Sequence, residues 1–382
     1  MKILLVGEYS RLHNSLKEGL VQLGHEVVIV GFKDGFKNFP VDLPLYQNWS
    51  GKFSGKIKNL IFRLTGFDLN SYGTYLQIKR YHKKLRGFDV VQLINENTFY
   101  CTPFFEKKIL HYLFKNNVKT FLLCCGTDYP TINYYYQNPQ FKSLLQPYLD
   151  GKIDDISFQN VLKYRKTEFK KLHDYIYKNI VGVLASDLDY HIPMQNHPKY
   201  LGMIPNPINI EKLPYHTPEI KDKIVIYHGI NDANYYKKGN DYFEKALEII
   251  AEKYGDRVEI ETTRSVPYAT YINLYQKAHI LLDMVYSHDQ GYHALEAMAQ
   301  GKVVFTGAEK EFEQYYHLAE KVNINACPDV NYLVEQLSYL IDNPSEIEAI
   351  SQRARSFVER EHNYINIAKQ YLKVWSEGYK KL

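Results

Sequence analysis

The sequence predicts an α/β protein that contains two doubly wound parallel sheets in tandem. Short apolar strands alternate with amphipathic helical segments through residues 1–204, and the same alternation restarts after residue 222. Between the two runs lies a stretch that begins at Pro205-Asn206-Pro207, where closely spaced prolines remove backbone donors and forbid helix continuation. Strands that alternate with helices indicate parallel sheets covered on both faces. The length of 382 residues fits two domains.

The first half opens as a βαβ unit. Residues 2–6 form an apolar strand, Gly7 turns the chain, leucines at helical spacing occupy 12–23, and residues 26–30 form a second strand. The same pattern then predicts strands at 89–93, 120–125, 182–185 and 200–204, with helices at 104–114 and 156–177.

The second half repeats the alternation. It predicts strands at 223–227, 258–261, 280–282 and 303–306, with helices at 241–254, 268–277 and 292–300. The last fifty residues are expected to be helical, with breaks near Asn343-Pro344 and Asn363. We therefore expect one domain over 1–205, a second over 206–362, and a terminal helix in 363–382 that packs back on the first domain. Ligands of such sheets lie beyond the carboxyl ends of the strands, so we expect the site in the cleft between the domains.

Composition excludes several classes of protein. With 45% hydrophobic and 24% charged residues, the chain has enough apolar sequence for sizeable cores, which excludes disorder. No apolar run approaches the roughly 18 residues of a membrane-spanning helix, and residues 3–6 are too short for a signal-peptide core. The four cysteines show no C-x-x-C spacing, which argues against a disulfide framework or a zinc site. We expect a cytoplasmic protein.

Charge is distributed unevenly along the chain. Residues 1–200 carry 27 Lys and Arg against 17 Asp and Glu, a net +10, whereas residues 201–382 carry 20 against 26, a net −6. A basic half suits an anionic partner such as a phospholipid surface or a phosphate-bearing substrate. Uneven solvated surface charge explains the same numbers equally well.

One basic segment is also amphipathic. Its cations alternate with apolar side chains at helical spacing: Lys52, Phe53, Lys56, Ile57, Lys58, Leu60, Ile61, Phe62 and Arg63. This composition is typical of a helix that lies on an anionic membrane, here the inner face of the cytoplasmic membrane. The alternative is a helix whose apolar side packs on its own domain. Nucleic acid is a poorer partner because no recognition motif accompanies the charge.

A candidate ligand-binding segment follows the strand at 280–282. Gly291 opens the helix, Glu296 lies about one turn into it, and Gly301 ends it before the next strand. A helix amino terminus presents free N–H groups and a partial positive charge, which suit a diphosphate. Glu296 is then placed to accept hydrogen bonds from ribose hydroxyls. An ordinary strand–helix–strand unit is the alternative.

This segment resembles the signature of the retaining GT-B glycosyltransferases, especially the GT4 group. Residues 295–301, Leu-Glu-Ala-Met-Ala-Gln-Gly, match the second half of that signature, and Gly291 stands at a family glycine. Where the family carries a Glu that contacts the donor sugar, this chain has His288, followed by Asp289. The resemblance implies the GT-B fold, in which two Rossmann-like domains face a central cleft. It places the acceptor on the N-terminal domain and the nucleotide sugar on the C-terminal domain.

The loop after the strand at 223–227 resembles the family's Gly-Arg…Lys-Gly loop, whose two cations neutralise the donor diphosphate. Lys238 takes the lysine position, whereas Ala233 or a neighbouring Asn replaces the arginine. The resemblance implies donor contacts from Gly229, Asn231 and Lys238. A solvated loop is the alternative.

The resemblance implies further donor contacts. The nucleotide base is expected against the turn at Arg264, Val266 and Pro267, although a proline in the first turn of a helix is also ordinary architecture. Asp289 and Tyr292 flank Gly291 and are expected to complete the donor site.

The N-terminal half offers fewer signals. Only Gly7 remains of the glycine-rich turn that relatives place near the donor phosphates. Cys125 replaces a His that touches the donor sugar in relatives, which leaves Asp128 as the available polar group, with capping of the next helix as the alternative. Glu96 is a candidate for orienting an acceptor hydroxyl, with an ordinary turn residue as the safer alternative. Asp187-Leu188-Asp189 is better explained by helix capping than by a metal, and we expect no metal site.

The resemblance implies transfer of a sugar, with retention, from a nucleotide diphosphate donor to a glycan or lipid-linked glycan hydroxyl in bacterial surface polysaccharide or glycoconjugate synthesis. No cofactor is expected, and UDP is favoured over GDP. Lys238, Glu296, His288 and Asp128 are the expected catalytic residues, acting mainly through electrostatic stabilisation. Because His288 replaces a carboxylate, we expect altered donor choice, such as a sugar with a carboxylate or N-acyl group.

Two alternatives remain open. Loss of the first Glu, the loop Arg and the His at Cys125 also fits a noncatalytic nucleotide- or glycan-binding subunit of an assembly complex. A sugar-nucleotide epimerase of the same architecture would interconvert donors without an acceptor.

Overall fold

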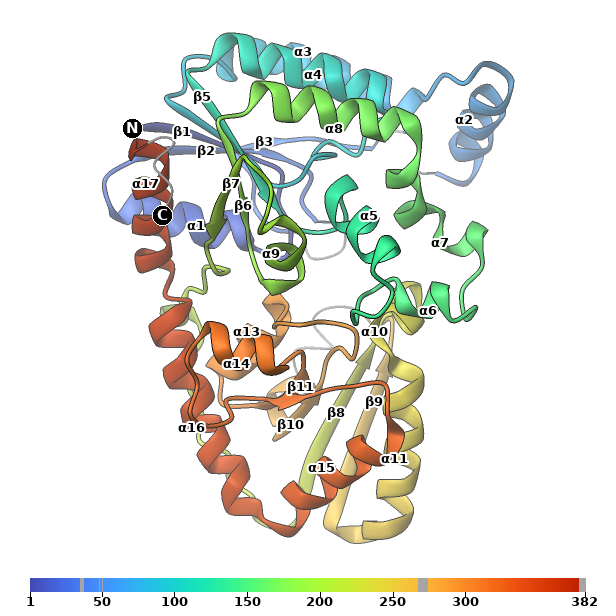
Figure 1. Cartoon of the computed structure of the whole chain (residues 1–382), viewed down its shortest axis with the longest axis vertical. Helices are drawn as coiled ribbons and strands as arrows, with labels where there is room; N and C mark the ends of the chain where they lie inside the picture. The colour runs from blue at the N-terminus through green and yellow to red at the C-terminus, as the bar shows by residue number, and fades with distance from the viewer. Residues whose placement is uncertain (35–37, 48, 50, 267–273, 378–382) are drawn as a thin grey trace.

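The computed structural model describes residues 1–34, 38–47, 49, 51–266 and 274–377 (Figure 1). Two α/β halves lie one above the other in this view, and each contains one parallel sheet with helices on its faces. The predicted fold class is confirmed.

The N-terminal sheet has the strand order β3-β2-β1-β4-β5-β6-β7, and all neighbours pair in parallel. The strands are β1 (Lys2–Val6), β2 (Glu26–Gly31), β3 (Leu43–Pro44), β4 (Val90–Leu93), β5 (Lys119–Cys124), β6 (Gly182–Ala185) and β7 (Tyr200–Met203). The order reverses between β1 and β4, so the crevice of this sheet lies beyond the carboxyl ends of these two strands.

The helices of this half are α1 (Leu12–Gln22), α2 (Lys52–Thr65), α3 (Leu69–Tyr81), α4 (Pro103–Asn116), α5 (Tyr129–Gln137), α6 (Gln146–Leu149), α7 (Asp155–Leu162), α8 (Thr167–Asn179) and α9 (Leu188–Met194). The single helix expected at 156–177 is wrong. A 3-10 turn at Lys163–Arg165 separates α7 from α8, and Lys166 is extended. Phe158 of α7 and Phe169 of α8 are both buried in the apolar core of the N-terminal half.

The C-terminal sheet has the order β12-β11-β10-β8-β9 and is also parallel. Its strands are β8 (Ile224–Ile230), β9 (Val258–Arg264), β10 (Ile280–Leu282), β11 (Val303–Thr306) and β12 (Ile324–Asn325). Its helices are α10 (Tyr235–Lys238), α11 (Asn240–Tyr254), α13 (Tyr292–Ala299), α14 (Lys310–Tyr315), α15 (Val330–Asp342) and α16 (Pro344–Glu361). Residues 274–277 are helical, and the rest of the helix expected at 268–277 lies outside the described residues.

The terminal helix α17 (Tyr364–Glu377) returns to the N-terminal half and lies beside α1 (Figure 1). Trp375 Nε1 donates to Gln92 Oε1 of β4 at 3.1 Å. Where α16 ends, His362 Nδ1 lies 2.9 Å from the carbonyl oxygen of Asn206 in the linker. The chain therefore connects its two halves twice, through the linker and through the α16–α17 junction.

A continuous apolar core also joins the halves. It includes Leu16 and Leu20 of α1, Ile208 of the linker, Leu295 of α13 and Phe357 of α16, all buried. Because this cluster belongs to neither half alone, the loops at the carboxyl ends of the two sheets are held against each other. Among the helices described, none combines the length and the apolar character needed to cross a membrane.

Candidate functional site

Lys238 lies at the end of α10, beyond the carboxyl end of β8. Gly239 follows with φ 74°, and a Cβ there would lie 2.5 Å from Val285 Cβ, so this close turn requires glycine. Lys238 Nζ donates to Asp283 Oδ1 at 2.8 Å. Asp283 comes directly after β10, the strand next to β8, so the sheet itself brings the two side chains together.

The amino terminus of α13 lies at the same place. Gly291 is its N-cap residue with extended backbone, and a Cβ at Gly291 would lie 3.9 Å from Asp283 Oδ2. His293 Nδ1 lies 3.6 Å from Asp283 Oδ1. One carboxylate therefore faces an ammonium, an imidazole and the positive end of a helix, and the last of these also attracts phosphate.

Tyr292 anchors α13 to the rest of the molecule. Its hydroxyl donates to the carbonyl oxygen of Pro207 at 2.8 Å and lies 2.5 Å from Ser15 Oγ of α1. Tyr292 is buried, and burial followed by the nearby Glu296 charge raises its pKa well above the usual value. Glu296 is half-buried one turn further along α13. Tyr292 therefore fixes the helix that carries Gly291 and Glu296.

The residues expected at the base and at the diphosphate loop have protein partners. The guanidinium of Arg264 is exposed and pairs with Asp232 and Glu244. Asn231 caps a 3-10 turn through a hydrogen bond from Ala233 N to its Oδ1 at 3.0 Å. Gly229 and Val266 are half-buried near the same edge, and Pro267 lies outside the described residues.

His288 lies in the loop after β10, at the boundary between the two halves. Its ring stacks on Tyr135 of α5, with centroids 6.1 Å apart. Nδ1 lies 3.3 Å from Glu309 Oε2, and Glu309 Oε1 lies 3.1 Å from Lys142 Nζ of the N-terminal half. Although burial opposes ionisation of Glu309, hydrogen bonding from His288 and the charge of Lys142 lower its pKa to about 2.

Carboxylates also cross the boundary. Asp189 of α9 accepts hydrogen bonds from Ser287 Oγ at 2.5 Å and from His288 N at 2.9 Å. In return, Asp289 Oδ2 accepts from Leu188 N at 3.2 Å. Burial and the Asp189 charge raise the pKa of Asp289 to about 7. Asp187 caps α9, as the sequence predicts, by accepting from Asp189 N.

Two N-terminal candidates lie deeper. Gly7 has φ 91°, and a Cβ there would lie 2.3 Å from Ile94 Cγ2, so the turn after β1 requires glycine. Asp128 is fully buried and caps α5 through Thr131 N at 2.9 Å. Burial, followed by the nearby Glu96 carboxylate, raises the pKa of Asp128 to about 7. Glu96 itself contacts His173 Nδ1 at 2.6 Å. Asp128 therefore caps α5, which is the alternative that the sequence offers. Its contact with a donor sugar stays a prediction.

The described residues form at least two cavities. One, of about 470 Å³, opens beside α14 and includes Glu309, Glu311, Asn323 and Tyr332 in its wall. The other, of about 590 Å³, lies between α1 and the linker. Lys238, Glu296 and Gly291 line neither cavity.

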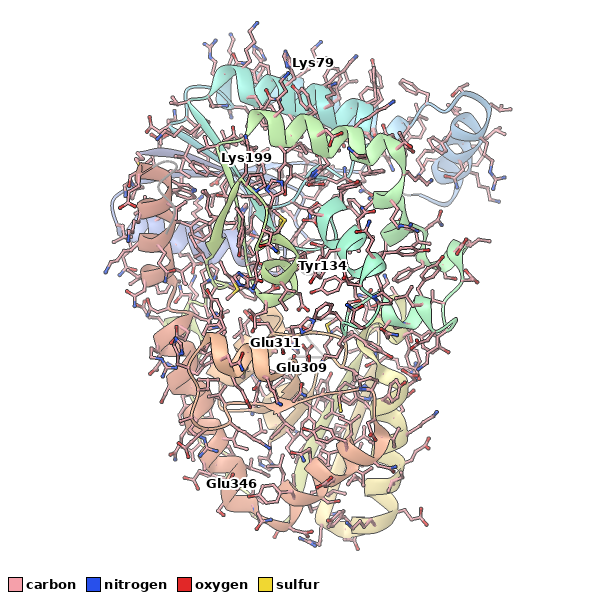
Figure 2. The ribbon with its side chains drawn as sticks, viewed as in Figure 1. Lys79, Tyr134, Lys199, Glu309, Glu311 and Glu346 are labelled. Carbon is pink, nitrogen blue, oxygen red and sulfur yellow. The ribbon has the colours of Figure 1, made fainter. Side chains whose placement is uncertain are left out.

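The structure adds residues that sequence reasoning missed. Asp283, His293, Asp189 and Glu309 all lie at the carboxyl edge of a sheet or at a helix start, where parallel sheets place ligand contacts. Figure 2 shows Glu309 and Glu311 at the edge of the C-terminal half that faces Tyr134. His288, Glu309 and Glu311 each offer one atom within 4.8 Å of the others. Their separation of about 20 residues in sequence conceals this group until strands β10 and β11 are paired.

The comparisons with known proteins agree with this geometry. Residues 233–373 match the family model described as glycosyl transferase-like, and this range includes Lys238, Gly291 and Glu296. No curated protein matches the sequence.

Several solved structures share the fold over almost the whole chain. Sucrose-phosphate synthase from Thermosynechococcus elongatus is 15% identical with a TM-score of 0.62, and the alignment covers 99% of each chain. HepE from Anabaena, solved with UDP and glucose, is 11% identical with a TM-score of 0.59, covering 99% of this chain and 100% of that one. A glycosyltransferase from Rickettsia africae is 14% identical with a TM-score of 0.53, covering 98% and 97%.

The fold is therefore that of the GT-B glycosyltransferases. The family model over residues 233–373 and this fold both agree with the resemblance predicted from the sequence.

Proposed function

We propose that the protein transfers a sugar, with retention at the anomeric carbon, from a nucleotide diphosphate donor to a glycan or lipid-linked glycan hydroxyl. The role would lie in bacterial surface polysaccharide or glycoconjugate synthesis, through a GT4-like site. The observation that carries the proposal is the convergence of Lys238, the α13 amino terminus and Glu296 at one edge of the C-terminal sheet. HepE, a structural neighbour, was solved with UDP-glucose, which supports a UDP-sugar as the first donor to test.

The proposed chemistry is electrostatic. Lys238 Nζ and the first N–H groups of α13 stabilise the negative charge that develops on the departing diphosphate. Glu296 accepts hydrogen bonds from the ribose and so fixes the donor relative to that charge. The domain boundary, closed by the Asp189 and Asp289 hydrogen bonds, excludes water and strengthens these interactions. The acceptor hydroxyl would enter from the N-terminal half.

Thermal unfolding with UDP, GDP and ADP tests the nucleotide site, because a ligand that binds only the native state raises the melting temperature. We expect UDP to give the largest rise and Glu296→Ala to abolish it. Glu335→Ala, on an exposed face of α15, is the control that should keep the rise. An unchanged UDP shift in Glu296→Ala would show that the ribose binds elsewhere. Hydrolysis of UDP-sugars by the native protein then separates an enzyme from a noncatalytic binding subunit.

We also propose that α2 attaches the protein to an anionic membrane surface. The helix contains no Asp or Glu, and its exposed apolar side chains include Phe53 at 78%, Leu60 at 58% and Leu64 at 75% exposure. Lys56 and Arg63 are exposed beside them. Figure 1 shows α2 projecting from the body of the N-terminal half. Exposed apolar groups combined with basic charge favour anionic lipid over water.

Sedimentation with vesicles tests this attachment. We expect binding to phosphatidylglycerol-containing vesicles, weaker binding to pure phosphatidylcholine, and loss of binding in Phe53→Ser/Leu64→Ser. Ile156→Ser removes an equally exposed side chain from α7 and should leave binding unchanged. If the α2 variant binds vesicles as the native protein does, or instead changes only the oligomeric state, the helix contacts protein rather than lipid.

A further inference from the structure

The inference concerns Glu309, and it rests on the proposed nucleotide-sugar site. Glu309 follows β11, the strand next to β10, and precedes α14. The loops after β10 and β11 are in contact: a Cβ on Gly307 would lie 2.5 Å from Ser287 O and 2.6 Å from Asp289 N. Glycine at 307 therefore allows an approach that brings Glu309 beside His288.

Glu309 is held as a carboxylate. Lys142 Nζ lies 3.1 Å from Oε1, and His288 Nδ1 lies 3.3 Å from Oε2. The Glu309 side chain nevertheless keeps 27% exposure and forms part of the wall of the 470 Å³ cavity. Its oxygens have lone pairs beyond those two contacts, so this carboxylate can accept hydrogen bonds from a ligand.

His288 supplies a second, unused polar group. Its side chain is 3% exposed, Nδ1 faces Glu309, and Nε2 has no hydrogen-bond partner among the described residues. A buried polar atom without a partner costs free energy, so a ligand that supplies one is favoured at this point. The ring of Tyr135 covers one face of the imidazole.

The short distance along the chain between His288 and the amino terminus of α13 indicates which part of a ligand would lie beside His288. His288 precedes Gly291 by three residues, which span at most about 10 Å of chain. A diphosphate at the α13 amino terminus therefore leaves the group attached to it within reach of His288 and Glu309. For a nucleotide sugar, that group is the sugar, whose hydroxyls both donate and accept hydrogen bonds.

We propose that Glu309 and His288 bind hydroxyls of the donor sugar, and that Glu309 supplies the carboxylate absent at position 288. A metal ion at His288, Glu309 and Glu311 is less favourable because the Lys142 ammonium already neutralises Glu309 at 3.1 Å. Binding of sugar hydroxyls by His288 and Glu309, whose side chains face each other, requires no cation.

Calorimetric titration with UDP and UDP-glucose, and with GDP and GDP-mannose, tests the proposal by comparing each diphosphate with its sugar conjugate. Glu309→Gln is expected to lower the affinity for the nucleotide sugar roughly 10- to 100-fold, as expected for loss of a hydrogen bond to a charged group. The affinity for the free nucleoside diphosphate should stay unchanged. His288→Glu/Glu309→Gln returns a carboxylate to position 288 and is expected to restore most of that affinity. Glu311→Gln, two residues further along the chain in α14, is the matched control. It should change the affinity for neither ligand by more than about twofold.

Four results would overturn the proposal. The first is that Glu309→Gln leaves the affinity for the nucleotide sugar unchanged. The second is that it lowers the affinities for the nucleotide sugar and the free diphosphate equally. Either result would place Glu309 outside the sugar site. Lys142→Met could reproduce the full Glu309→Gln loss, which would show that the ion pair acts only by joining the two halves. Stabilisation of the native protein by MnCl2 or ZnCl2, lost in Glu311→Gln, would identify a metal site. Failure of the proposed function is distinct, because then no nucleotide binds the native protein, and the sugar assignment falls with it.

Discussion

Lys238 and Asp283 form a partly buried ion pair where the diphosphate is expected, with Nζ 2.8 Å from Oδ1. The Asp283 side chain is only 5% exposed, and it also lies 3.6 Å from His293 Nδ1. A diphosphate that binds Lys238 must compete with this carboxylate for the same ammonium. The pair therefore affects how strongly this site attracts phosphate.

Asp283→Asn tests that competition. Removing one negative charge beside the diphosphate is expected to raise the affinity for UDP several-fold, and the gain should shrink at high salt because screening weakens charge interactions. Titration calorimetry at two salt concentrations measures both effects. Asp256→Asn removes a fully exposed carboxylate from the same half and should change nothing. A loss of affinity in Asp283→Asn would instead show that Asp283 orients Lys238 for binding.

Lys238→Met tests the cation itself. Methionine keeps the length of the side chain and removes the charge, so we expect UDP affinity to fall roughly 10- to 100-fold through loss of a charge-assisted contact. Sugar transfer or donor hydrolysis should fall at least as far. Lys237→Met is the matched control, because the neighbouring ammonium reaches Asn234 Oδ1 and the ring of Phe158 rather than Asp283. Equal losses in the two variants would mean that only the general charge of α10 matters.

The raised pKa of Asp289 leads us to expect that the stability of the protein depends on pH. Its pKa is about 7 in the native protein because of burial and the Asp189 charge, whereas an unperturbed aspartate titrates near 3.8. Between these values the native protein keeps a proton that the unfolded chain has lost, so the free energy of unfolding falls as pH rises from about 4 to about 7. Asp289→Asn removes this term. We expect its melting temperature to rise relative to the native protein as pH increases over that range.

The measurement is the difference in melting temperature between Asp289→Asn and the native protein at pH 4.5 and 7.5. Asp189→Asn serves as the comparison, because it weakens hydrogen bonds from Ser287 and His288 and is expected to lower stability at both pH values. A constant difference for Asp289→Asn across the pH range would show that this carboxylate keeps its ordinary pKa at the domain boundary.

Much of the fold could be predicted because periodicity and breakers are local signals. The strands at 2–6, 182–185, 280–282 and 303–306 lie where apolar runs place them, and the two parallel sheets follow from their alternation with helices. The break between α7 and α8 was missed because no proline or glycine marks it. The structure places a 3-10 turn at Lys163–Arg165 and an extended Lys166 there, while Phe158 and Phe169 on either side are both buried in one core.

The site was predicted less completely. Glycine positions and the Glu296 helix could be recognised because close turns and helix starts have local signatures. Asp283 and Glu309 gave no such signal, since their roles depend on which strands are neighbours in the sheet. The same holds for Asp189, whose partners Ser287 and His288 belong to the other half. Contacts that cross 20 to 100 residues are fixed by topology, which no short pattern encodes.

Trp375 attaches α17 to the N-terminal half. Its indole is fully buried and donates to Gln92, a buried amide in the middle of β4. Trp375→Ala is expected to lower the free energy of unfolding by about 3–5 kcal/mol through the cavity it leaves. Trp375→Phe keeps most of the ring but leaves Gln92 Oε1 without its donor, so we expect a loss of about 1–3 kcal/mol. Denaturant unfolding measures both, and Tyr339→Ala, which truncates an exposed ring of α15, is the control. If Trp375→Phe costs nothing, the indole acts by packing alone, and the amide of Gln92 has another partner in solution.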